Sequence, residues 1–187
     1  TISGNNVYVD ITANNSDATL DASATVGGFV LDNTGGTGSD LNLNGNTLTI
    51  AGGILLSTGS QNNEILAGGT LTFGNNAATG YEGRIHGVRQ IDIRALIADN
   101  GANPVSITTD GTVYFHNNNT YTGATRINSG RLETGTANAL PVTTILTVAD
   151  GAALRLFGGS QEIGGLTGKG FVENQNTTTN VRTLTIN

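Results

Sequence analysis

The hydrophobic residues of this chain fall in short alternating runs that recur along the sequence. A turn of Gly, Asn or Asp leads into each run, and most runs end in a similar turn. The clearest copies are Asn44–Gly52 and Gly68–Asn75, and weaker copies are Asp110–Phe115, Ser129–Gly135 and Asp150–Leu156. The first apolar residues of these copies are Leu48, Leu71, Val113, Leu132 and Leu154. Apolar residues at every second position predict β-strands.

The spacing of the runs predicts a coil of stacked rungs. The steps between the first apolar residues are 23, 42, 19 and 22 residues, and Ile91 or Ile93 lies near the middle of the step of 42. A period of about 20 residues built on short strands is typical of a β-solenoid. We therefore predict a single all-β solenoid segment over residues 1–187, with less regular rungs in 1–40 and clear repeats in 41–187.

The segment Arg84–Ala98 fits two structures. Its apolar residues can be arranged on one face of a helix, but Ile91 and Ile93 alternate with Asp92 and Arg94. The alternation favours strands. Charged residues replace the Gly and Asn of the other repeats here, so the sequence leaves a regular rung in this segment open.

Stacking explains why such a sequence would coil. Rungs about 4.8 Å apart give each strand hydrogen-bonding partners above and below. Inward Leu, Ile, Val and Phe then form columns, in which each buried side chain contributes about 1.5–3 kcal/mol. The end rungs would leave unpaired edges. Because the chain starts in mid-pattern and ends on the strand Thr183–Asn187, we expect a longer natural molecule or copies stacked end to end.

Composition and charge exclude several classes of protein. Gly, Thr and Asn are abundant and there are only two prolines, which suits many short strands joined by tight turns. The net charge is −6 and Lys169 is the single lysine, so no basic surface for nucleic acid is expected. No apolar run is long enough to span a bilayer. The absence of cysteine excludes disulfides and thiolate metal sites.

One stretch resembles a known repeat. Residues 118–132 read NNTYTGATRINSGRL, close to the pattern NNTYTGxTxINxGxL of the passenger-associated repeats of bacterial autotransporters. The continuation through Ala139-Leu140, Ala149–Leu154 and Ile163–Gly170 is similar to the next phrases of that family, and Ile97–Gly101 to the segment before it. The resemblance covers 95–172 well and 41–74 loosely. It implies a right-handed parallel β-helix, secretion, and a passenger or stalk role, and it implies no particular activity.

Several residues are candidates for metal binding or catalysis, and each also has a purely structural explanation. Gly35–Asp40 fits the start of the calcium-binding pattern GGxGxD, but Asn42 stands where an apolar residue belongs and no second copy follows. We interpret this segment as a Gly-rich turn. The two histidines, His86 and His116, are expected to be outward polar residues on strands.

A polysaccharide-binding or polysaccharide-cleaving groove is the enzyme-like alternative. Asp92 and Arg94 would share a strand face near Arg84 and Arg89, although an outward salt-bridged face explains the same charges. Aromatic residues close to His116 fit either a platform for sugars or, more simply, aromatic stacking inside or outside the coil. These residues are Tyr114, Phe115 and Tyr121.

We therefore assign no catalytic, cofactor-binding or metal-binding residue and expect no enzyme. The sequence predicts a structural or adhesive segment of a secreted or cell-surface bacterial β-helix protein. Its expected partners are neighbouring rungs or copies of itself end to end, with surface glycans as a further partner, no nucleic acid and no membrane insertion. Two alternatives stay open: a subunit of an extracellular filament, and a carbohydrate-binding or polysaccharide-active β-helix.

Overall fold

The computed structural model describes residues 6–11, 17–34, 40–65, 68–74, 81–175 and 181–187. Within these residues the secondary structure consists of strands joined by turns and bends. The strands are β1 (Val7–Ile11), β2 (Ala18–Thr19), β3 (Ala24–Asn33), β4 (Leu41–Asn42), β5 (Thr47–Gly59), β6 (Asn63–Ile65), β7 (Thr70–Phe73), β8 (Glu82–Ile93), β9 (Leu96–Ile97), β10 (Ser106–Phe115), β11 (Thr125–Ile127), β12 (Arg131–Thr134), β13 (Ile145–Val148), β14 (Ala153–Leu156), β15 (Gln161–Ile163), β16 (Gly165–Gly168), β17 (Phe171–Asn174) and β18 (Leu184–Ile186).

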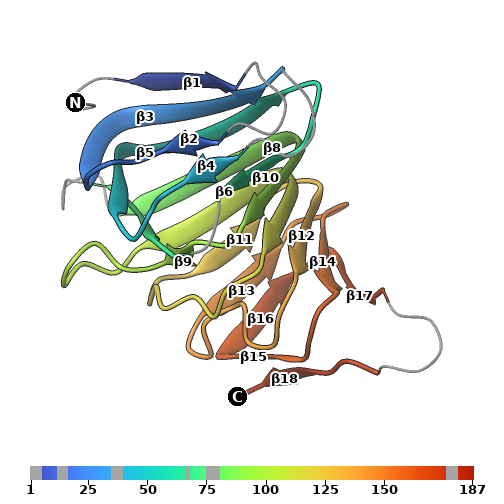
Figure 1. Cartoon of the computed structure of the whole chain (residues 1–187). Coiled ribbons are helices and arrows are strands. Elements are labelled where there is room, and N and C mark those ends of the chain that lie inside the picture. Colours follow the sequence, from blue (N-terminus) through green and yellow to red (C-terminus); the bar gives the residue numbers. More distant parts are fainter. Residues whose placement is uncertain (1–5, 12–16, 35–39, 66–67, 75–80, 176–180) are drawn as a thin grey trace.

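The strands form a parallel β-solenoid of about 7 turns with about 23 residues per rung. The coils stack from the N-terminal end at the top of Figure 1 to the C-terminal end at the bottom. All pairings between strands are parallel in the described residues, so each coil lies on the one before it in the same direction. The predicted all-β solenoid is confirmed.

The strands form three ladders, which we call faces A, B and C. Face A follows the order β1-β3-β5-β8-β10-β11-β13-β16. Face B follows β2-β4-β6-β8-β10-β12-β14-β17, and face C contains β3-β5-β7-β9 and, further along, β15-β18. The long strands β3, β5, β8 and β10 turn a corner and so belong to two faces each.

The core is a set of apolar columns inside the coil. On face C, Leu48 pairs with Leu71, which pairs with Ile97. On face B the column runs through Ile91, Val113, Leu132, Leu154 and Val172. The aligned first apolar residues of the repeats therefore belong to two columns on different faces. Leu71 pairs with Ile97 on face C, whereas Ile91 pairs with Asn63 on face B.

The charged segment around β8 forms a regular coil. Its first half pairs with β5 on face A, where Arg84 lies beside Ile54, and its second half pairs with β6 on face B, where Ile91 lies beside Asn63. Ile91 and Ile93 are fully buried, whereas Arg84 points to solvent. The strand prediction is confirmed, and the regular rung that the sequence left open is present because the inward positions remain apolar.

Between β9 and β15, face C is held by side-chain amides rather than by strands. The buried Asn119 accepts a hydrogen bond from the backbone N–H of Ile97 at 2.8 Å and donates one to the carbonyl of Ala139 at 2.9 Å. Gln161, also buried, accepts one from the N–H of Leu140 at 3.1 Å. These amides connect successive coils where the backbone departs from strand geometry.

Candidate functional site

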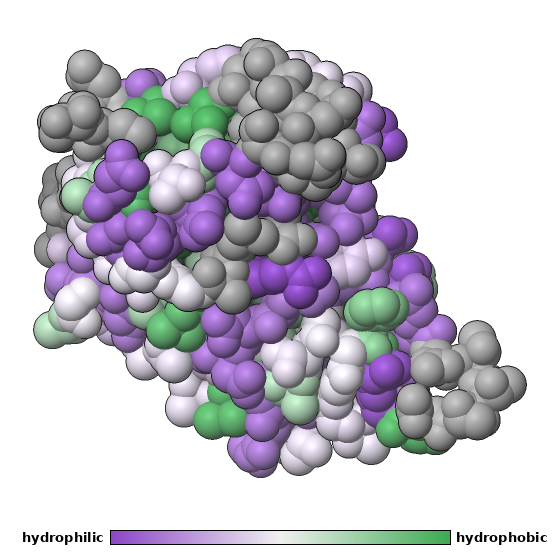
Figure 2. Space-filling view, in the orientation of Figure 1, coloured by the Kyte–Doolittle hydropathy of each residue, from purple (hydrophilic) through white to green (hydrophobic). Residues whose placement is uncertain are grey.

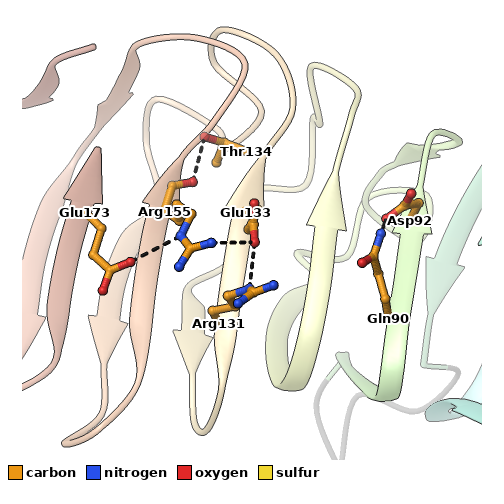
Figure 3. A network of polar contacts seen from close by, with 7 residues as sticks. All are labelled: Gln90, Asp92, Arg131, Glu133, Thr134, Arg155 and Glu173. Atoms are coloured by element: carbon orange, nitrogen blue, oxygen red, sulfur yellow. Dashed lines mark hydrogen bonds and ion pairs between the residues drawn. The ribbon is translucent and has the colours of Figure 1, made fainter. Parts of the chain in front are cut away.

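A column of polar residues runs along the outside of face B. Asp92, Tyr114, Glu133, Arg155 and Glu173 occupy one register position of β8, β10, β12, β14 and β17. They face outward because the strand alternates and the residues on either side face the core. Figure 3 shows the part of this column formed by Asp92, Glu133, Arg155 and Glu173. Charges of opposite sign on successive coils lie about one ladder spacing apart, near 4.8 Å.

Glu133 is the centre of this column. Its side chain is fully buried although it points away from the core, because its neighbours cover it. The Nε of Arg131 lies 2.6 Å from its carboxylate, and Nη1 of Arg155 lies 3.3 Å from it. Arg155 also bridges to Glu173 at 3.1 Å (Figure 3). A buried carboxylate needs such partners, since an unpaired buried charge is strongly destabilising.

Tyr114 covers the other side of this network. Its hydroxyl is half-buried, and burial raises the pKa of Tyr114, with the nearby Glu133 carboxylate raising it further and Arg131 acting in the opposite direction. The ring of Tyr114 stacks on His116, with the ring centres 5.8 Å apart and the planes 10° from parallel. Phe157 meets the same ring edge-on at 6.3 Å. The three rings form a continuous aromatic cluster at the corner between faces B and C.

The backbone makes room for this cluster. Gly135 lies against His116, and a Cβ at position 135 would fall 2.0 Å from His116 Nδ1. His116 Nε2 lies 3.9 Å from the Asp92 carboxylate. The imidazole is thus held between Tyr114, Gly135 and Asp92, on a turn immediately after β10, and not on a strand as the sequence led us to expect. His86 is on a strand, β8, and is exposed.

A groove opens beside the aromatic cluster. It has a volume of about 490 Å³ and is lined by Phe157, Gly158, Gln175 and Arg182. This volume lies within the range of about 300–1,000 Å³ of small-molecule sites. The side chain of Phe157 is 41% exposed, so its ring is available on the groove side.

The charged groove expected around β8 does not form as one site. Arg84 is on face A and pairs with Glu82 at 3.7 Å, whereas Asp92 is on face B and accepts a hydrogen bond from Gln90 at 2.9 Å. Arg89 donates to the carbonyl of Ser60, and Arg94 follows β8 as an exposed residue. The corner of the coil separates Arg84 from Asp92, so the Arg84–Glu82 pair is an outward ion pair on a strand and not part of a groove.

The aromatic platform predicted from the sequence is only partly present. Phe115 and Tyr121 have no exposed surface and belong to the core, whereas Tyr114 is outward. The exposed partner of Tyr114 is Phe157, which sequence reasoning missed. No repeat phrase marks Phe157, since it comes just after the strand β14 and reaches Tyr114 across two coils.

Residues 35–39 of the predicted calcium-binding pattern lie outside the described residues. Asp40 is described, and its backbone N–H donates a hydrogen bond to the Asp17 carboxylate at 3.1 Å. Within the described ranges no group of three or more His, Cys, Asp or Glu residues could hold a metal ion. We find no helix in this part of the chain with the length and apolar character needed to cross a membrane.

No family model matches the sequence. None of the curated proteins matches it, and no solved structure matches the chain. The functional argument therefore rests on the geometry of the coil and on the residues themselves.

Proposed function

We propose that this chain is a structural and adhesive segment of a secreted or cell-surface bacterial β-helix protein, similar to an autotransporter passenger or stalk. The observation that supports this most is the continuity of the ladders, which run along faces A and B from the first coil to the last. The repeat resemblance at 118–132 supports the bacterial surface setting. No catalytic step is part of the proposal.

The geometry suits a load-bearing rod. The backbone hydrogen bonds of a parallel stack lie along the axis of the coil, and faces A and B carry them side by side along the whole stack. A pull along the axis is therefore shared by several bonds at every coil. Buried columns such as Val113–Leu132–Leu154 resist sliding of one coil over another. The outer surface is mostly polar, and Figure 2 shows hydrophobic residues in separate spots on the visible face.

A surface-display experiment tests this role. The chain is fused between a bacterial outer-membrane anchor and an outer epitope tag, and the tag is quantified on intact cells before and after protease treatment. We expect display of the tag and survival of the segment. Leu132→Asp, which places a charge in a fully buried position, should abolish both. Val142→Asp, at a residue 43% exposed, is the matched control and should leave both unchanged.

Two results would reject the stalk function. One is degradation of the displayed wild-type segment at the rate of the Leu132→Asp variant. The other is a wild-type chain that folds in vitro as well as Val142→Asp does, but whose fusion leaves the tag inside the cell.

A filament subunit is the second candidate, and the last described coil favours it. Strands β16, β17 and β18 each pair on one side only. Leu166, Phe171 and Val172 on this coil are 37%, 59% and 43% exposed. A further coil, whether from the same chain or from another copy, would cover these residues.

The concentration dependence of assembly tests the second candidate. Light scattering and electron microscopy of the isolated chain should show fibres above a threshold concentration, and the double variant Leu166→Lys with Phe171→Lys should remain monomeric. Val142→Lys, at an exposed position just before β13, a strand that already has partners on both sides, should assemble like wild type. A wild-type chain that stays monomeric up to millimolar concentration rejects this candidate.

A further inference from the structure

The groove beside Phe157 is lined by an aromatic ring, a side-chain amide and a guanidinium. Gly158 lines it, and the backbone there is packed so closely against the coil before that a Cβ at position 158 would fall 1.8 Å from the carbonyl oxygen of Gly135. The other lining residues in the described part of the chain are Phe157, Gln175 and Arg182.

The aromatic wall is fixed in place. Phe157 packs edge-on against Tyr114, and Tyr114 is itself stacked on His116. Glu133 and Arg131 lie beside Tyr114 and hold that ring from the other side. A rigid aromatic ring at a groove wall presents a flat apolar surface with little conformational entropy to lose. Such a surface suits the C–H face of a sugar ring.

The polar lining defines the charge of the occupant. Arg182 is half-buried, and no hydrogen bond or ion pair joins its guanidinium to any other described residue. By contrast, Arg155 is paired with two carboxylates on the neighbouring coils. The guanidinium of an arginine matches a carboxylate with two parallel hydrogen bonds, so Arg182 is available to an external carboxylate. The exposed Gln175 amide supplies a donor and an acceptor for hydroxyl groups.

We propose that this groove binds an acidic sugar, a six-membered ring that carries a carboxylate. The ring stacks on Phe157, the carboxylate pairs with Arg182, and the ring hydroxyls hydrogen-bond to Gln175. The proposal names the class of partner that the adhesive segment would bind. It depends on the proposed function only because such sugars are met outside the cell. Uronic acids and sialic acids share this chemistry, so the experiment includes a probe of each source.

Calorimetric titration of the full chain with trigalacturonate and with 3′-sialyllactose tests the proposal, with lactose as the neutral probe. We expect one of the two acidic probes to bind, and lactose to bind about tenfold more weakly or not at all, because a hydrogen bond to a charged group contributes about 1.5–3 kcal/mol. Arg182→Gln should weaken the acidic probe about tenfold or more. Phe157→Ala should weaken it about threefold to tenfold.

Matched variants separate the site from general charge and from unfolding. Arg126→Gln removes an exposed arginine on face A and should leave the affinity within about twofold. Gln175→Glu adds a negative charge at an exposed lining position and should weaken the acidic probe while leaving the melting temperature unchanged. Circular dichroism of each variant confirms that the fold is retained.

Three outcomes would overturn the site. They are no binding of either acidic probe, equal binding of lactose, and equal losses with Arg126→Gln and Arg182→Gln. Each of these leaves surface display and protease resistance of the segment intact, so failure of the sugar site is distinguishable from failure of the stalk function.

Discussion

Single residues hold the coil together where strands are interrupted. Asn119 spans three coils, since its amide connects the Ile97 N–H of one coil to the Ala139 carbonyl of the coil after its own. The side chain is 6% exposed, so water cannot replace either bond easily. One residue thus satisfies two backbone groups that a strand pairing would otherwise satisfy.

Replacing Asn119 should destabilise the chain well beyond the loss of one surface contact. Asn119→Ala leaves the Ile97 N–H and the Ala139 carbonyl buried without partners, and each unsatisfied group costs about 1–3 kcal/mol. Urea unfolding at neutral pH measures the total. Asn118→Ala is the control, because the Asn118 side chain is exposed and donates a single hydrogen bond to Ala137 at 3.0 Å. Equal losses for the two variants would contradict the bridging role.

A second residue-scale prediction concerns alkaline pH. Tyr121 is fully buried, and its hydroxyl lies 2.7 Å from the Thr125 hydroxyl, which is 2.9 Å from that of Thr144. Burial raises the pKa of Tyr121 well above its ordinary value, because the phenolate would have to lose its water. The folded chain therefore holds this proton more tightly than the unfolded chain does.

The sign of the pH effect follows from that difference. The stability that the neutral Tyr121 contributes is fully present below about pH 10 and is lost as the pH rises above the unfolded-state value. We expect the free energy of unfolding to fall by at most about 1.4 kcal/mol per pH unit for this one proton. Tyr121→Phe should flatten the decline between pH 10 and 11.5, while Tyr8→Phe, at a residue 60% exposed, should not. Urea unfolding at several pH values measures both.

At the scale of elements, the corner between faces A and B depends on stacked glycines. Gly111 has φ of 76°, a left-handed conformation, and a Cβ there would fall 2.0 Å from the carbonyl oxygen of Gly87 on the coil before. Gly130 repeats the arrangement one coil later, with φ of 68° and a Cβ position 2.2 Å from the carbonyl oxygen of Gly111. The coils approach most closely at this corner, so the turn needs both the conformation and the missing side chain.

Comparison of two glycine variants separates these two requirements. Gly101 also has a positive φ, 63°, but nothing lies within 4 Å of its Cβ position. Gly101→Ala should therefore cost only the left-handed conformation, about 1–2 kcal/mol. Gly111→Ala should cost the same plus about 1–3 kcal/mol for the displaced backbone. Equal losses in chemical denaturation would show that the corner tolerates a side chain.

The strands that could be predicted from the sequence are those whose apolar residues alternate within a run flanked by Gly or Asn. Leu132 and Leu154 were expected to stack, and they pair directly. The division into three faces was not predictable in the same way. Leu71 and Ile91 have similar runs around them, and only the path of the chain between them decides that they belong to different ladders.

The candidate site was less predictable, for a physical reason. Alternation distinguishes inward from outward residues, but it does not say which outward residues meet across coils. Glu133 and Arg155 are 22 positions apart in the sequence and adjacent in space. A repeat of constant length would have predicted this contact. Phe157 reaches Tyr114 from a turn, where the register of the ladder no longer determines side-chain position. The sequence left open whether Phe115 and Tyr121 lie inside or outside the coil, because aromatic content alone does not reveal burial.

For the whole molecule, the stack behaves as a one-dimensional array. Each coil contacts the coil before it and the coil after it, and contacts between more distant coils are few. The central coils around β8, β10 and β12 have partners on both sides, whereas β1 and β2 at one end and β16 to β18 at the other have partners on one side only. Stability should therefore vary along the axis, because an end coil opens at the cost of one interface and a central coil at the cost of two.

Native-state hydrogen exchange of the isolated chain measures this gradient directly. The backbone amides of Ile91, Val113 and Leu132, in the central part of face B, should exchange most slowly, at a free energy approaching that of global unfolding. The amides of Val172 and Ile186 should exchange through local opening at a lower free energy, and added urea should affect their exchange less, since less surface becomes exposed when one coil opens. Leu132→Ala provides the internal control: it should lower protection in the adjacent coils more than in the end coils. Uniform protection from β1 to β18 would mean that the stack opens as a single unit, and the nearest-neighbour description would then be wrong.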